Sequence, residues 1–182
     1  KVMPRLKKVD LFDVLDSSAE KMADEVRTQY PRITITAFPF ASLEDHVRKA
    51  DIIVTCTPSK KGFIKKDWLR RGSHINTIGA DMPGKQEIDP GITASVKVFG
   101  DSRYQAAQKG ECQHAVLAGL IKPEKITEIG EVLNGVKPGR TSSDEITMFD
   151  ATGMALQDLI AAKAALERAE AQNIGTVVEM EQ

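Results

Sequence analysis

Three ionisable side chains, Asp81, Lys85 and Glu87, lie within seven residues directly after a short apolar segment. That segment, His74–Ile78, predicts a buried strand, and the Gly79-Ala80 pair after it lets another molecule approach the backbone closely. A carboxylate at the carboxyl end of a strand lies where open α/β sheets bind their ligands. If Asp81 is desolvated there, it can hold or release a proton, because burial raises the pKa of a carboxyl group.

The same stretch has a plainer interpretation. Asp81 precedes Met82-Pro83-Gly84, and an Asp in this place commonly makes a turn with its own backbone. Lys85 and Glu87 are then a solvated pair on the surface, whereas in a binding site Lys85 holds a phosphate or a substrate carboxylate. Taken alone, the stretch favours the plain turn, so the choice between a turn and a binding site depends on the elements around it.

Two further segments place polar groups after apolar strands. Asp13 follows the run that begins at Val9, and an acid there can accept hydrogen bonds from the ribose hydroxyls of a dinucleotide. Thr57-Pro58-Ser59 follows the apolar run Asp51–Thr57, at the edge where a cofactor cleft forms. An ordinary turn explains each segment when it is taken singly. The Gly-x-Gly-x-x-Gly sequence that precedes the ribose-binding acid in dinucleotide folds is not in the chain.

A third segment, 149–153, joins a predicted strand to a predicted helix through Gly153. The first amides of a helix can receive an anion in such a turn. The alternative is an ordinary helix cap, with Asp150 or Thr152 as the capping residue.

Composition restricts the function classes. The chain has 182 residues, with 25 basic and 26 acidic side chains and a formal net charge of −1, which gives no electrostatic case for nucleic acid or an anionic membrane. No apolar run approaches the roughly 20 residues of a membrane helix. The two cysteines and three histidines show no spacing typical of a metal site or a disulfide. A cytoplasmic protein without a metal fits these features.

Apolar strands alternate with helical patterns along the chain. This alternation predicts an α/β fold with a doubly wound parallel sheet, and continuous apolar runs such as 51–57 suit strands covered on both faces. Strands are expected at 9–14, 33–38, 51–57, 74–78, 96–100, 146–150 and 176–180. Helices are expected at 16–30, 42–50, 101–109, 114–120, 126–133 and 153–171, with a helical turn at 66–69.

In their order, these segments resemble the ornithine cyclodeaminase/μ-crystallin family, from Val9 to about Ala171. The resemblance implies a Rossmann domain that binds NAD or NADP, beside a second domain that makes a homodimer and much of the substrate site. Residues 1–150 would then be a fragment of the Rossmann domain without its first strand and glycine-rich loop, and 151–182 a helix and short strand that return to the missing second domain. The matching segments are 50–59, 72–87 with the run Gly-Ala-Asp-Met-Pro-Gly-Lys, 129–132, 138–140, 146–153 and 157–158.

The resemblance also implies a role for particular residues. Asp81 would be the acid/base at the reacting carbon and would contact the substrate. The family often has Ser at the position of Ala151, which leaves the substrate open. Asp13, Thr57, Ile78, Gly79, Ala80 and Lys85 would bind the cofactor, NAD or possibly NADP, and Ala151 and Thr152 would border the substrate.

The function that the resemblance favours is hydride transfer between nicotinamide and the α-carbon of a small 2-amino or 2-imino acid, as in alanine dehydrogenases and imino-acid reductases. One alternative is an ornithine or lysine cyclodeaminase, which releases ammonia and forms a cyclic imino acid product. Another is a non-catalytic protein that binds NADP(H) and a ligand, as in the μ-crystallin branch. A Rossmann domain of unrelated purpose is a third.

Overall fold

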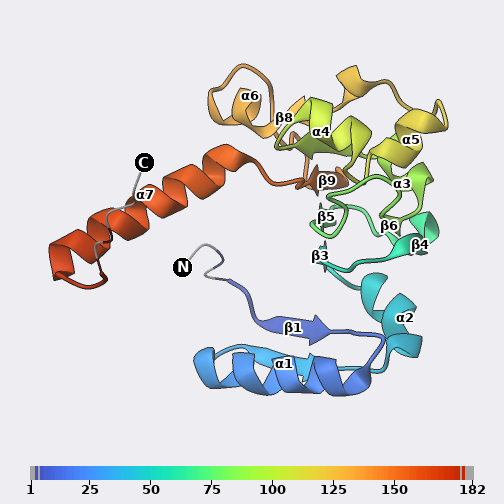
Figure 1. The fold of residues 1–182 in the computed structure, drawn as a ribbon. Coiled ribbons are helices and arrows are strands. Elements are labelled where there is room, and N and C mark those ends of the chain that lie inside the picture. The colour runs from blue at the N-terminus through green and yellow to red at the C-terminus, as the bar shows by residue number, and fades with distance from the viewer. Residues whose placement is uncertain (1–2, 4, 177, 179–182) are drawn as a thin grey trace.

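The structure is a computed structural model that describes residue 3, residues 5–176 and residue 178. Strands and helices alternate along the chain (Figure 1), which confirms the α/β class. The strands are β1 (Lys8–Leu11), β2 (Thr34–Ala37), β3 (Ile52–Thr55), β4 (Lys60–Ile64), β5 (His74–Thr77), β6 (Gln86–Ile88), β7 (Lys97–Gly100), β8 (Thr127–Glu128) and β9 (Thr147–Asp150). The helices are α1 (Asp16–Gln29), α2 (Leu43–Val47), α3 (Pro90–Ser95), α4 (Arg103–Gln108), α5 (Gln113–Leu117), α6 (Ile129–Leu133) and α7 (Ala155–Gln172), with a 3-10 turn at Lys66–Trp68.

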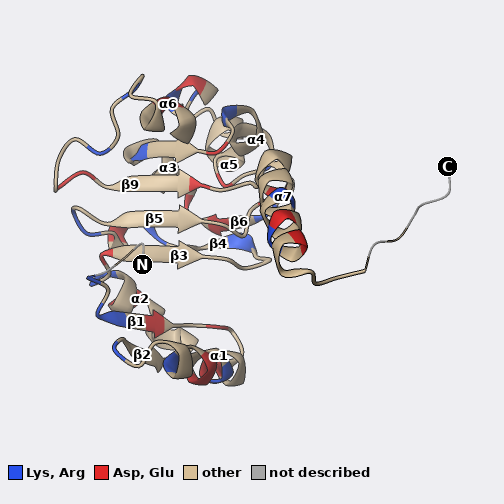
Figure 2. Ribbon diagram, turned by 90° about the vertical axis from the view of Figure 1, so that its left-hand side faces the viewer, with Lys and Arg blue, Asp and Glu red and all other residues tan. Residues whose placement is uncertain are grey.

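Five strands form the main sheet in the order β3-β5-β9-β7-β8, and every pairing in it is parallel. Parallel neighbours need crossover connections, so strands that are distant in the sequence become adjacent. The carboxyl ends of β3, β5 and β9 therefore meet at one edge, and α7 lies beyond that edge (Figure 2). This edge is where the predicted site residues after β3, β5 and β9 come together.

One row of side chains across the sheet forms the centre of the core. Ile53, Ile75, Met148 and Val98 are paired in register across four strands, and each is buried. A continuous apolar row of this kind stabilises a sheet through the area it removes from water. The residues that join it in the same cluster from β4, β6 and α3 are Ile64, Ile88 and Ile92.

The opposite side of β3 is uncovered in the described part of the chain. Ile52 is 39% exposed and Val54 is 59% exposed. Ile53 and Thr55, which alternate with them along the strand, are buried. The expectation that the run 51–57 is covered on both faces is therefore wrong for this chain. The alternation follows from the strand geometry, which points successive side chains to opposite faces.

The strands expected at 9–14 and 33–38 form a sheet of their own. β1 and β2 pair in parallel, and α1 packs beside them with Ala19 and Ala23 buried. Among the described residues β1 pairs only with β2 and β3 only with β5, so the two sheets stay separate. The expected α/β fold with parallel strands is confirmed, and its strands are divided between separate sheets in the described chain.

Strands β4, β6 and β8 and helix α3 were not anticipated from the sequence. β4 and β6 form a two-stranded parallel sheet, and α3 follows β6. Both strands are short and begin with polar residues, and their pairing joins segments far apart in the chain, which local patterning does not reveal. Part of the helix expected at 126–133 is also a strand, because Thr127–Glu128 pairs with β7 and the helix begins only at Ile129.

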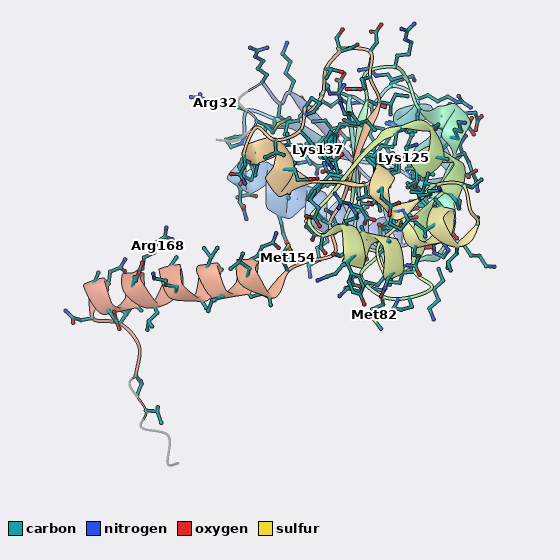
Figure 3. All side chains as sticks on the ribbon, turned by 90° about the horizontal axis from the view of Figure 1, so that it is seen from above. Arg32, Met82, Lys125, Lys137, Met154 and Arg168 are labelled. Atoms are coloured by element: carbon teal, nitrogen blue, oxygen red, sulfur yellow. The ribbon has the colours of Figure 1, made fainter. Side chains whose placement is uncertain are left out.

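Helix α7 extends away from the sheets and has no buried residue. Met154 lies where α7 leaves the rest of the chain, and Arg168 lies near its outer end, clear of the sheets (Figure 3). The strand expected at 176–180 lies outside the described residues, apart from Thr176 and Val178. Among residues 3, 5–176 and 178 we find no helix long and apolar enough to cross a membrane.

Candidate functional site

The loops after β3, β5 and β9 run side by side at the carboxyl edge of the sheet. The amide of Ile78 donates to the carbonyl of Thr55 at 2.8 Å, and the amide of Ala151 donates to the carbonyl of Thr77 at 3.0 Å. The parallel pairing thus continues one residue past the strand ends. It places Ile78 and Ala151, both predicted site residues, on neighbouring loops.

An open pocket of about 310 Å³ lies at this edge. It brings together four of the predicted site residues, Ile78, Asp81, Ala151 and Thr152. Phe149, Gly153 and Gln157 also line it and belong to segments that the sequence singled out without a role of their own, whereas Asp101 was not singled out.

Asp81 lies at the rim of this pocket with its side chain 51% exposed, and Lys85 Nζ pairs with Asp81 Oδ1 at 2.6 Å. The hydrogen bond from Lys85 is the largest of the effects that lower the pKa of Asp81. The condition of desolvation, under which the pKa would be raised, is not met in the described chain: the carboxyl group is exposed and has a cation beside it. The pair favours an ionised carboxylate that can accept a proton.

Helix α5 holds the turn that carries Asp81 and Lys85. Gln113 Oε1 accepts the amide of Gly84 at 2.8 Å, and a ring nitrogen of His114 lies 2.7 Å from the carbonyl of Lys85. Gly84 has a φ of +82°, which a residue with a side chain rarely adopts. The turn is thus defined by its own glycine and by two side chains from a distant helix.

Thr57 points its hydroxyl into the protein. It donates to Oε1 of Glu87 at 2.8 Å and accepts the amide of Ser59 at 3.3 Å. Because its hydroxyl bonds within the protein, Thr57 can offer a cofactor only its other atoms. The partner, Glu87, has no exposed surface, so the expectation that Lys85 and Glu87 form a solvated pair is wrong.

Gly79 and Ala80 follow β5 and face the protein interior. A Cβ atom on Gly79 would lie 2.2 Å from the carbonyl oxygen of Thr57 and 2.5 Å from Oε1 of Glu87. Glycine is therefore required here by the neighbouring loop of the protein itself, whereas the sequence suggested the approach of another molecule. Ala80 is completely buried, so its side chain offers no surface to a ligand in the described chain.

Asp13 lies apart from the pocket, in the loop after β1. Its side chain is exposed, and Oδ1 accepts the amide of Leu15 at 2.8 Å. The second carboxylate oxygen remains available for a ribose hydroxyl. The cofactor role of Asp13 stays a prediction.

The side chain of Asp101 binds the donors of the turn at 149–153. Its carboxylate accepts the amides of Thr152 and Gly153 at 2.8 and 2.7 Å, and the hydroxyl of Thr152 at 2.8 Å. The donors that were considered for a bound anion are thus taken by a side chain of the protein. Neither capping alternative is found either, because α7 begins at Ala155 with Met154 as its N-cap.

Sequence reasoning overlooked Asp101, although a signal was present. Like Asp81, it follows directly after an apolar strand, here the one predicted at 96–100. It is 9% exposed and lines the pocket, so the same rule that singled out Asp81 would have found it.

Three buried carboxyl groups form a chain behind the loops, which we call the carboxyl chain: Glu87, Glu111 and Asp150. Asp150 accepts the amides of Glu111 and Cys112 at 3.1 and 2.9 Å, and Glu111 accepts those of Glu87 and Ile88 at 2.9 and 2.8 Å. Burial raises the pKa of Glu111 to about 8 and that of Asp150 to about 6. Asp150 thus fixes the backbone at Glu111, and Glu111 fixes the backbone at Glu87.

The described residues contain no group of three or more His, Cys, Asp or Glu side chains that could hold a metal ion. The carboxyl groups at this edge are instead satisfied by backbone amides, hydroxyls and Lys85.

Comparison with known proteins places this chain in a family. The family model described as the ornithine cyclodeaminase/mu-crystallin family matches residues 1–173. The chain is 39% identical over 171 residues to the alanine dehydrogenase of Archaeoglobus fulgidus, covering 93% of this chain and 51% of that protein. We conclude that the chain belongs to the ornithine cyclodeaminase/mu-crystallin family, as its sequence suggested.

Solved structures agree with this assignment. The iminosuccinate reductase of Paracoccus denitrificans, in complex with NAD+, superposes with a TM-score of 0.88 at 34% identity, over 97% of this chain and 53% of that one. The Δ1-pyrroline-2-carboxylate reductase of Thermococcus litoralis, with NADH and L-proline, has a TM-score of 0.89 at 30% identity, over 94% and 53%. The chain thus spans about half the length of the relatives that it matches.

The ion pair at the pocket rim gives a first prediction. Replacing Lys85 by Met should raise the pKa of Asp81, because the largest cause of its lowering is removed. A carboxyl carbon chemical-shift titration by NMR measures it. Lys109→Met is the matched control and should raise it less, since the charge of Lys109 is the smallest of the effects on this pKa. An unchanged pKa in Lys85→Met would contradict the assignment.

The carboxyl chain gives a second prediction. The pKa of Glu111 is about 8 in the folded protein against an ordinary 4.5, so between these values the folded state holds a proton that the unfolded chain has lost. Its stabilisation is complete below about pH 4.5 and is lost as the pH rises through about 8. Relative to Glu111→Gln, the unfolding free energy of the wild type should therefore fall across this window.

Urea unfolding at several pH values measures the difference. The exposed Glu124→Gln variant should follow the wild type at every pH. Parallel curves for the wild type and Glu111→Gln would show that Glu111 does not bind a proton in the folded protein.

Proposed function

We propose that the chain is part of an NAD-dependent oxidoreductase. It transfers hydride between nicotinamide and the α-carbon of a small 2-amino or 2-imino acid. The observation that carries the proposal is the pocket at the carboxyl edge of the parallel sheet, where Asp81, paired with Lys85, lies beside Ile78 and Ala151. Open α/β sheets bind nucleotides and their substrates at this edge.

Asp81 is the group that handles the proton. Oxidation of an amino acid removes a hydride from the α-carbon and a proton from the nitrogen, and the cofactor supplies the hydride acceptor. Asp81 accepts the proton, and in the reductive direction it returns it. The lowered pKa keeps this carboxyl group ionised near neutral pH, so that it has a site for the proton.

The pocket is small enough to suit a small substrate. Its volume of about 310 Å³ lies at the lower end of the range of ligand sites, which is roughly 300–1,000 Å³. Ala151 and Thr152 border the substrate in this proposal. The hydroxyl of Thr152 is occupied by Asp101, so Thr152 contributes shape more than a hydrogen bond.

We assign the cofactor as NAD, with NADP as the alternative. Asp13 supports NAD, because a carboxylate there favours free ribose hydroxyls over a 2′-phosphate. Two solved structures to which this chain is similar, those named above, contain NAD+ or NADH. Thr57, Ile78, Gly79 and Lys85 line the cofactor in this proposal, Thr57 and Gly79 mainly through their backbone, and Ala80 lies behind them.

The division into domains belongs to the proposal as well. Residues 1–150 form the cofactor-binding part, and 151–182 pack on a second domain that makes a homodimer of a cytoplasmic enzyme. Two observations support it. Both β1 and β3 have an open edge among the described residues, and α7 presents Leu156, Leu159 and Ile160 to solvent.

Turnover by the full-length protein tests the proposed function. With NAD and alanine, or with NADH and an imino acid such as iminosuccinate, the absorbance of NADH should change steadily. Asp81→Asn should lower kcat by about 100-fold or more, because a positioned general base contributes about 10²–10⁴-fold. Asp45→Asn, at an exposed acid on α2, is the matched control and should keep the wild-type rate.

Other outcomes separate the alternatives. Release of ammonia from ornithine without net NADH would identify a cyclodeaminase. Dinucleotide binding without turnover of any amino or imino acid would identify a binding protein. Full activity of Asp81→Asn would overturn the role of Asp81.

A further inference from the structure

We propose that Glu87 is the positioning residue of the dinucleotide site. Its buried carboxylate ties the loop after β3 to the loop after β5 and sets the spacing between them. The inference rests on the proposed function, because those loops carry Thr57 and the segment from Ile78 to Asp81. Glu87 itself does not touch substrate or cofactor, and it acts through the backbone of both loops.

The two oxygens of Glu87 are divided between the loops. Oε1 accepts the amide of Thr57 at 2.6 Å and its hydroxyl at 2.8 Å. Oε2 accepts the amide of Gly79 at 3.0 Å and the hydroxyl of Thr55 at 2.7 Å. All four partners are donors, so both oxygens act as acceptors. One side chain thereby fixes one backbone amide in each loop.

Burial makes these contacts obligatory. Glu87 has no exposed surface, and among the described residues no lysine, arginine or histidine forms an ion pair with it. A buried carboxyl group without a cation has to be satisfied by hydrogen-bond donors. The two loops supply them, and in return the loops cannot move apart without leaving the carboxylate unpaired.

The loops are also as close as their backbones allow. A Cβ atom on Gly79 would lie 2.2 Å from the carbonyl oxygen and 2.6 Å from the amide nitrogen of Thr57. Asp81 follows Gly79 by two residues, so the position of Gly79 limits where the carboxylate of Asp81 can lie over the pocket. A displacement of about 1 Å at such a place is enough to cost about 100-fold in rate.

Glu111 provides a matched control within the carboxyl chain. It is 1% exposed and holds β6 through the amides of Glu87 and Ile88. Its Oε1 accepts both amides, at 3.0 and 2.8 Å, and its Oε2 shares the amide of Glu87 at 2.9 Å. A glutamine at 111 with its carbonyl oxygen in the place of Oε1 therefore keeps an acceptor for both amides. A glutamine at 87 cannot, because its NH2 group must face the amide of either Thr57 or Gly79.

The experiment compares Glu87→Gln and Glu111→Gln in the full-length protein. Titration with NADH gives the dissociation constant, and amide hydrogen exchange reports on Thr57 and Gly79. Glu87→Gln should raise the NADH dissociation constant by about tenfold or more, because an unpaired buried amide is costly. It should also speed exchange at one or both amides. Glu111→Gln should stay within about twofold of the wild type near neutral pH.

A second variant keeps the inference testable if Glu87→Gln does not fold. Thr55→Val removes one donor to Oε2 without changing the side-chain shape, and Thr55 is outside the proposed binding surface. It should weaken NADH binding in the same direction, by about two- to fivefold, and speed exchange at Gly79. The thermal unfolding temperatures of Thr55→Val and Glu111→Gln are compared as well. Weaker NADH binding by Thr55→Val at a similar unfolding temperature would show that loop spacing, and not a general loss of stability, causes the effect.

The outcomes distinguish this inference from the proposed function. Failure of the wild type to bind NADH would overturn the proposed function and the site with it. If the wild type binds and Glu87→Gln binds equally well, only the role of Glu87 is overturned. Equal losses in Glu87→Gln and Glu111→Gln would also overturn it, since the effect would then belong to the whole carboxyl chain.

Discussion

The candidate site depends on the hydrogen bonds to the carboxylate of Glu87, which is buried and has no cation beside it in the described part of the chain. Its oxygens need donors, and the amides of Thr57 and Gly79 supply them at 2.6 and 3.0 Å. This requirement draws the loops after β3 and β5 into contact and leaves no room for a side chain at Gly79. Glu111 and Asp150 extend the same arrangement to β6 and β9, so the carboxyl edge of the sheet is held from behind by one connected set of carboxyl groups.

The pocket follows from that arrangement. With the loops fixed, Ile78 and Ala151 lie side by side, and the turn held by Gln113 and His114 brings Asp81 to the rim. The ion pair with Lys85 and the exposure of the side chain both favour the ionised form of Asp81. A proton acceptor beside the opening where open parallel sheets bind nucleotides is the arrangement that a hydride-transfer enzyme for amino acids needs.

Much of this was predictable from the sequence. The apolar runs identify the parallel strands, and because parallel strands share one carboxyl edge, residues after different strands had to converge there. The burial of Glu87 was the main feature that the sequence did not predict. A Glu two residues after a Lys looks solvated, and its burial depends on amides up to 30 residues away, at Thr57. The lowered pKa of Asp81 and the separate β1–β2 sheet likewise depend on contacts that local patterns do not contain.

A crystal structure of the full-length protein with NADH tests the central claim most directly. We expect the nicotinamide ring in the pocket beside Ile78 and Ala151, with the carboxylate of Asp81 next to the space left for the substrate. A nicotinamide ring bound away from this pocket, or a substrate whose reacting carbon lies out of reach of Asp81, would contradict the account.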